Sequence, residues 1–260
     1  MEHPLKTTLK RATPWLLSGG IVIWLFWRID LERFSGALAG ADHAVLFLWL
    51  SLFPVIVFLA DSATLTLLFR RLLVPIRYGE VLAVKGTSYF VNALNYSAAT
   101  GALAYFMKRK KGTPFLESLS TLLWLNFVDI IGLFIMLTVG SFFGAEHLPD
   151  ALAEQVGWVL SIGWVVVILA WVYWHGEVDY PFLSPLRHWR IFSVFSRATP
   201  SDYMAMITAR VAFMHLYVVM HYMLLPTFDI HAGILVLLVY TPLISFVQVI
   251  PASISGLGAV

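Results

Sequence analysis

Long apolar stretches, each close to the thickness of a bilayer, constrain this chain more than any other feature of its sequence. A membrane-spanning helix needs about 20 mainly apolar residues. The stretches that approach or exceed this length are Val45–Phe69, Leu119–Phe143, Val156–Trp174, Ile207–Leu225 and Ala232–Ile250. The chain is 60% hydrophobic and 12% charged, whereas soluble domains are about 45–50% apolar and about 25% charged. This composition excludes a soluble domain, a disordered chain and a nucleic-acid-binding protein.

A shorter apolar stretch, Pro14–Trp27, completes the predicted set of about six spans. The alternative is a cleaved signal peptide, with Ala37–Ala39 as a weak cleavage site. The charged stretch Arg28–Arg33 lies between the apolar run and that site, which fits a signal peptide poorly. We therefore expect one all-α domain, residues 1–260, that forms a polytopic transmembrane helical bundle.

The stretch Gly86–Met107 is long enough to span a membrane but too polar to face lipid. Its polar side chains are Thr87, Ser88, Asn92, Asn95, Ser97 and Thr100. Two interpretations remain open: a re-entrant helical element that enters and leaves on one side, or an ordinary seventh span. Because irregular backbone at membrane depth survives only where protein or water covers it, a re-entrant element predicts a polar cavity.

The distribution of basic residues favours the re-entrant interpretation, because cytoplasmic loops of membrane proteins are enriched in Lys and Arg. If Gly86–Met107 returns to its starting side, 14 Lys and Arg residues fall on the cytoplasmic side and 2 on the outer side. If it spans, the counts become 7 and 9. The acidic outer loop Gly144–Gln155, which has no Lys or Arg, agrees with the first arrangement and with a cytoplasmic N-terminus.

The end of the sequence predicts a second re-entrant element, at about residues 251–260. Pro251 ends the preceding apolar stretch, and small residues then leave the backbone exposed and easily bent. An open backbone that ends in the bilayer core is unfavourable, so we expect the native chain to continue beyond Val260. The residues expected to line the two halves of a polar path are Asn92, Asn95, Ser97 and Gly101, and Pro251, Ser253, Ser255, Gly256 and Gly258.

Ionisable residues inside the apolar stretches are candidates for function, because charges at membrane depth are costly. Asp61, Asp129 and Arg210 are such residues. A structural interpretation is that Asp129 pairs with Arg210, so that both charges are neutralised and the helices are fixed together. The two interpretations are compatible, since a paired charge can also line a path for a ligand.

The densest charge cluster is Lys108–Lys111. One interpretation is that the cluster is a topology signal that contacts anionic lipids. The other is that Lys108 and Arg109 bind an anionic head group at the mouth of the cavity. No catalytic or metal-binding motif accompanies the cluster. The chain has no cysteine, its eight histidines include no His-Glu-x-x-His motif, and its close acidic pairs fit solvated loops. We expect neither metal nor cofactor, and an enzyme is the less favoured interpretation.

Three segments resemble one known family. The first begins at the basic Arg70–Leu73 and continues through Asn92–Ser97 and Gly101 to Lys108–Lys111. The second is Asn126–Asp129, and the third is Pro251–Gly258, which ends in Gly-Leu-Gly. Together they resemble the transmembrane region of lysylphosphatidylglycerol synthases, also called the flippase-like family. The sequence departs from the family pattern at Tyr96 or Ser97 where a proline is expected, at Ala102 instead of glutamate, and at Asn126 instead of arginine.

The resemblance implies two facing re-entrant elements, a location in a bacterial or archaeal cell membrane, and the handling or flipping of lipids. The ligand would be a membrane phospholipid or a polyprenyl-linked lipid. Some members carry a soluble aminoacyl-transferase domain that these 260 residues do not contain, so we expect no complete synthase activity. The alternatives are a membrane component of a lipid or glycan biosynthesis pathway, and a structural scaffold. The sequence leaves homo-oligomer formation open.

Overall fold

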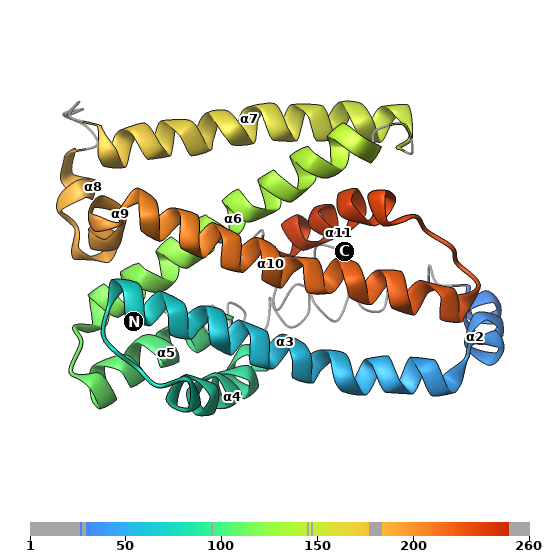
Figure 1. Cartoon of the computed structure of the whole chain (residues 1–260), viewed down its shortest axis with the longest axis horizontal. Helices are drawn as coiled ribbons and strands as arrows, with labels where there is room; N and C mark the ends of the chain where they lie inside the picture. The colour runs from blue at the N-terminus through green and yellow to red at the C-terminus, as the bar shows by residue number, and fades with distance from the viewer. Residues whose placement is uncertain are drawn as a thin grey trace, which may run out of the picture.

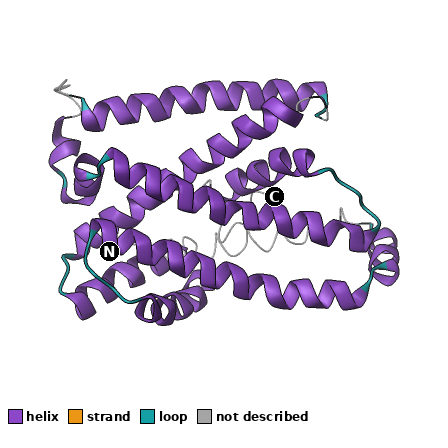
Figure 2. Cartoon of the chain, viewed as in Figure 1, coloured by secondary structure: helices purple, strands orange, loops and turns teal. Residues whose placement is uncertain are grey.

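The computed structural model describes residues 27, 30–94, 96–144, 146, 148–176 and 184–249, and the regular structure within these ranges is helical (Figures 1 and 2). The α-helices are α2 (Leu31–Gly40), α3 (His43–Leu72), α4 (Tyr78–Leu94), α5 (Tyr96–Lys111), α6 (Phe115–Gly144), α7 (Asp150–His175), α8 (Ser184–His188), α9 (Ser193–Arg197), α10 (Pro200–Leu224) and α11 (Ile234–Val249). Two short 3₁₀ turns, η2 (Arg190–Phe192) and η3 (Leu225–Phe228), join neighbouring helices. The all-α prediction is confirmed.

Four of these helices, α3, α6, α7 and α10, are long and apolar enough to cross a membrane. In Figure 1, α3, α7 and α10 run along the long axis of the view and α6 crosses it diagonally; α3 packs against α10, and α7 packs against α6. Each corresponds to one predicted apolar stretch. The stretch predicted at Ala232–Ile250 forms the shorter helix α11, of 16 residues. The predicted span Pro14–Trp27 lies outside the described residues except for Trp27, so the full number of spans remains a prediction.

Polar caps fix where the long helices begin. The Asp42 side chain accepts hydrogen bonds from the backbone N–H groups of Ala44 and Val45 at the start of α3. At the start of α10, Thr199 and Asp202 form a capping box, in which each side chain accepts a hydrogen bond from the other residue's backbone N–H. The caps satisfy N–H groups that have no partner within the helix.

The two ends of the bundle carry opposite charge. The end where α3, α5 and α7 finish, on the left in Figure 1, is basic. Its described Lys and Arg residues are Arg70, Arg71, Arg77, Lys108, Arg109, Lys110, Lys111, Arg187, Arg190 and Arg197. At the opposite end, the described acidic residues are Asp30, Glu32, Asp42, Glu146, Asp150, Glu154 and Asp229, beside Arg33. This is the charge asymmetry on which the predicted orientation depends.

The polar stretch folds as a helical hairpin, made by α4 and α5, which pack against each other (Figure 1). Lys111 Nζ at the end of α5 lies 2.8 Å from Glu80 Oε2 in the first turn of α4, so the hairpin begins and ends at the same end of the bundle. The 17 residues of α4 extend about 25 Å, less than the hydrocarbon thickness of about 30 Å. The hairpin starts earlier than predicted, at Tyr78 rather than Gly86.

Close approach of α6 and α11 depends on two glycines four residues apart. A Cβ atom at Gly140 would lie 2.6 Å from the Leu238 carbonyl oxygen, and one at Gly144 would lie 3.0 Å from that of Leu235. Small residues at this spacing let helices pack backbone to backbone in a membrane. Because α6 also contacts α3, α5, α7, α9 and α10, it is the central helix of the described bundle.

Candidate functional site

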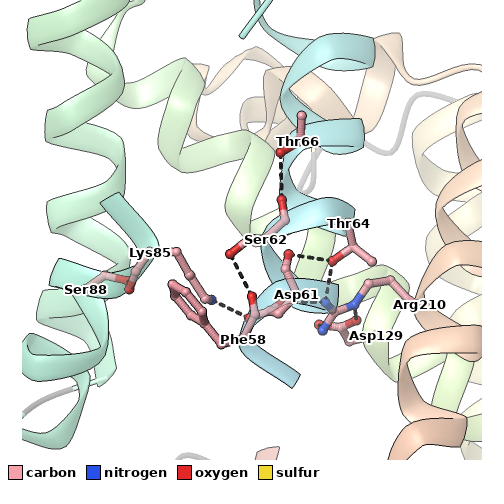
Figure 3. Close-up of polar contacts among 9 residues, drawn as sticks. All are labelled: Phe58, Asp61, Ser62, Thr64, Thr66, Lys85, Ser88, Asp129 and Arg210. Carbon is pink, nitrogen blue, oxygen red and sulfur yellow. Dashed lines mark hydrogen bonds and ion pairs between the residues drawn. The ribbon is translucent and has the colours of Figure 1, made fainter. Parts of the chain in front are cut away.

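Four charged side chains from four helices meet inside the bundle (Figure 3). They are Asp61 on α3, Lys85 on α4, Asp129 on α6 and Arg210 on α10, and we call them the charged cluster. Asp61 and Arg210 each lie about three turns, and Asp129 about four turns, from the basic end of their helices. At about 5.4 Å per turn this places the cluster roughly 16–22 Å from that end, near the middle of a bilayer.

Arg210 is the centre of the cluster. Its guanidinium contacts both oxygens of Asp129, through Nε on Oδ1 and through Nη2 on Oδ2 at 3.0 Å. Its Nη1 donates to Asp61 Oδ1 at 2.8 Å and to Thr64 Oγ1 at 3.1 Å, and the group lies 4.5 Å from the centre of the Phe213 ring. A bidentate arginine–carboxylate contact is among the stronger polar interactions in proteins. The predicted pairing of Asp129 with Arg210 is confirmed.

Lys85 completes the cluster from the hairpin. Its Nζ lies 2.6 Å from Asp61 Oδ2 and 5.3 Å from the centre of the Tyr89 ring. Asp61 therefore binds Arg210 with one oxygen and Lys85 with the other. The two carboxylates and the two cations sum to zero charge, and the four side chains are between 9% and 17% exposed.

The sequence analysis does not single out Lys85, which is one of the 14 Lys and Arg residues counted on the cytoplasmic side, just before Gly86. In the structure α4 begins at Tyr78, which places Lys85 two turns inside the helix. A signal was present: Ser88 and Tyr89 follow at the spacing that places them on the same helical face as Lys85.

A cavity of about 260 Å³ lies against the charged cluster. The hairpin supplies one wall, with Ser88 and Ala99 among its residues, and α6 and α10 supply others, including Asn126 and Phe213. Ser88 and Ala99 are almost fully buried. The polar cavity expected beside a re-entrant element is thus present in the described part of the chain.

The predicted site residues fall into three groups. Asp129 and Arg210 belong to the charged cluster, and Gly101 follows Thr100, which lines the cavity. Lys108 and Arg109 lie in the last turn of α5, exposed at the basic end and away from the cluster. The side chains of Asn92 and Ser97 lie outside the described part of the structure, as do all of Asn95 and Pro251, Ser253, Ser255, Gly256 and Gly258.

A second, more open hollow of about 590 Å³ lies at the neck of the hairpin, lined by Arg70, Arg77, Glu80 and Lys111 with Pro75 and Ile76. We call it the basic recess. Arg70 Nε donates to the Ile76 carbonyl oxygen at 2.7 Å, which fixes the turn between α3 and α4. The hydrogen bond from Lys111 holds the pKa of the Glu80 carboxyl below its ordinary value, with a smaller contribution from the Arg77 backbone N–H.

Comparison with known proteins agrees with this architecture. No curated protein and no solved structure matched the chain. The family described as "Lysylphosphatidylglycerol synthase TM region" matches residues 13–260, which is nearly the whole sequence. The chain therefore belongs to the lysylphosphatidylglycerol synthase transmembrane-region family and is an integral, multi-pass membrane protein.

Proposed function

We propose that this protein binds the head group of a membrane phospholipid or a polyprenyl-linked lipid in the cavity and moves it between the two leaflets. The observation that carries the proposal is the polar cavity beside the charged cluster, about halfway along the long helices. A site at this depth is accessible to neither aqueous phase without a path through protein. A lipid head group that crosses the bilayer passes through this depth.

The cost of the charged cluster supports a functional role. Charged side chains in membrane helices are rare and mark substrate or ion pathways by default. A scaffold would gain the same helix packing from apolar contacts, since replacing a buried ion pair by well-packed apolar residues is often neutral or stabilising. The lipid-related family of the chain supports a lipid as the ligand.

The basic recess is a suitable entrance for an anionic phosphate from the same side. Arg70, Arg77 and Lys111 outnumber Glu80, so the recess has an excess of positive charge. Glu80 and Lys85 are five residues apart on α4, or about 8 Å along the helix axis. A head group captured at the recess would move little more than one turn along α4 to reach the level of Lys85, the cluster residue on the hairpin.

The orientation of the bundle follows from the same charges. The positive-inside tendency favours a cytoplasmic location for the basic end and the neck of the hairpin. If Pro14–Trp27 spans the membrane as predicted, the N-terminus lies on the same side. Single cysteines at Gly79, Lys110 and Ala151, introduced into the naturally cysteine-free chain, test this orientation with an impermeant thiol reagent. We expect Gly79→Cys and Lys110→Cys to react from the cytoplasmic side and Ala151→Cys from the outer side. Opposite sidedness of the first two would show that the polar stretch spans.

Filling the cavity tests the function itself. Ala99→Phe places a ring in the hairpin wall, so we expect movement of an acyl-labelled fluorescent phospholipid in proteoliposomes to fall at least tenfold. Val166→Phe on α7, where Val166 is 57% exposed, is the matched control and should leave movement unchanged. Unaltered movement in Ala99→Phe would refute a path through this cavity. A biosynthetic enzyme would instead be recognised by turnover of an activated donor by the purified protein.

A further inference from the structure

The two cations of the charged cluster are held in different ways. Arg210 contacts both oxygens of Asp129, one oxygen of Asp61 and the Thr64 hydroxyl, and it also lies against Phe213. Lys85 contacts one carboxylate oxygen, Asp61 Oδ2. Opening the Lys85–Asp61 ion pair therefore leaves Arg210 fully paired, whereas displacing Arg210 breaks every other contact in the cluster.

The Lys85–Asp61 ion pair also joins two parts of the bundle. Lys85 is the member of the cluster that comes from the α4–α5 hairpin, and Asp61 belongs to the long helix α3 (Figure 3). An ammonium on a flexible four-carbon chain exchanges partners more readily than a planar guanidinium held in a bidentate contact. A ligand that enters the cavity can thus insert between Lys85 and Asp61 without disturbing α6 and α10.

The net charge of the cluster determines which ligand can insert there. The cluster is neutral, with two carboxylates and two cations, so an anionic head group adds an unpaired negative charge to a buried site. A cationic head group adds an unpaired positive charge. Both are penalised because an uncompensated charge in a low-dielectric interior is costly. A zwitterionic head group replaces one internal ion pair with two new ones and leaves the site neutral.

We infer that the cavity selects a zwitterionic phospholipid head group with a primary ammonium, whose phosphate binds Lys85 and whose ammonium binds Asp61. This inference rests on the function proposed above. The primary ammonium follows from the group that it replaces, since Asp61 Oδ2 accepts from the primary ammonium of Lys85 at 2.6 Å. The cavity, at about 260 Å³, is slightly smaller than the roughly 300–1,000 Å³ of typical small-molecule sites. It suits a head group whose acyl chains remain outside.

The test compares three lipids with the same labelled acyl chain in proteoliposomes that contain the full chain. We expect phosphatidylethanolamine to move about tenfold faster than phosphatidylglycerol, which is anionic. We also expect it to exceed phosphatidylcholine, whose quaternary ammonium has no N–H donor. Equal or faster movement of phosphatidylglycerol would overturn the inference while leaving the proposed function in place. Movement of none of the three would overturn the inference, together with the phospholipid form of the proposed function.

Charge-changing variants assign the selectivity to the cluster. Asp61→Asn leaves the Arg210–Asp129 contact intact and gives the cluster one net positive charge, so preference should shift toward phosphatidylglycerol by about tenfold or more. Lys85→Gln gives one net negative charge and should slow both lipids, with the larger loss for phosphatidylglycerol. Asp150→Asn makes the same chemical change at an exposed position at the opposite end of the bundle and should preserve the selectivity. An unchanged lipid preference in Asp61→Asn would refute the assigned contact.

Discussion

Among the described residues, the ion pairs at the basic end and those of the charged cluster differ in depth. At the basic end, Arg71 pairs with Asp202, Lys111 with Glu80 and Arg197 with Glu117, and the exposed fraction of these side chains reaches 41%. In the charged cluster the corresponding maximum is 17%. The end pairs join neighbouring helix ends where water is available. The buried pairs lie where each charge needs a partner, so the same type of contact has different consequences at the two depths.

Replacing the central arginine, Arg210, should lower the free energy of unfolding more than any other change proposed here. Arg210→Met leaves Asp61 and Asp129 without their shared cation, and breaking a buried ion pair from one side typically costs about 3–5 kcal/mol. Arg71→Met, at the basic end, should cost about 0.2–1 kcal/mol, as exposed pairs do. Thermal unfolding of both variants in detergent or nanodiscs measures the contrast. Similar losses in the two variants would show that depth does not distinguish the two sets.

Within the cluster, the two carboxylates should differ in their contribution to stability. Asp129→Asn removes the bidentate contact and leaves Arg210 and Lys85 to share Asp61. Asp61→Asn leaves the bidentate contact in place. Because a hydrogen bond to a charged group contributes about 1.5–3 kcal/mol, we expect Asp129→Asn to be less stable than Asp61→Asn by about that amount. The same unfolding measurement applies, and the reverse order would show that Asp61 rather than Asp129 anchors Arg210.

Depth also explains how much of the structure the sequence could predict. The long helices were predictable because hydropathy over about 20 residues reports contact with lipid. On α7 this remains visible, since Ile162, Val165 and Leu169 are each at least 55% exposed. The hairpin was predictable in outline because charge counting fixes the side on which a segment ends.

The charged cluster was predictable only in part. Asp129 and Arg210 stand out as ionisable residues within apolar stretches, and their pairing follows from the cost of leaving either one alone. Lys85 did not stand out because it follows Arg77 in a stretch where basic residues were already expected on the cytoplasmic side. The start of α4 decides its role, and element boundaries depend on tertiary contacts such as the hydrogen bond from the Tyr78 hydroxyl to the Leu59 carbonyl oxygen.

The smallest expected effect belongs to the pair at the neck of the hairpin, and it should depend on pH. The hydrogen bond from Lys111 lowers the pKa of Glu80 in the folded protein. The pair therefore stabilises the fold fully at pH values above the pKa that Glu80 has in the unfolded chain. This stabilisation is lost as the pH falls through the lower, folded value.

The difference in unfolding temperature between the unmodified chain and Glu80→Gln should therefore be present near neutral pH and vanish in acid, where Glu80 is protonated. Glu154→Gln, an exposed carboxylate at the opposite end, is the control and should show no such change. A difference for Glu80→Gln that persists in acid would mean that the side chain holds the neck by its shape rather than by its charge. The start of α4 and the end of α5 would then be held together by packing alone, and charge would contribute to stability only in the buried cluster.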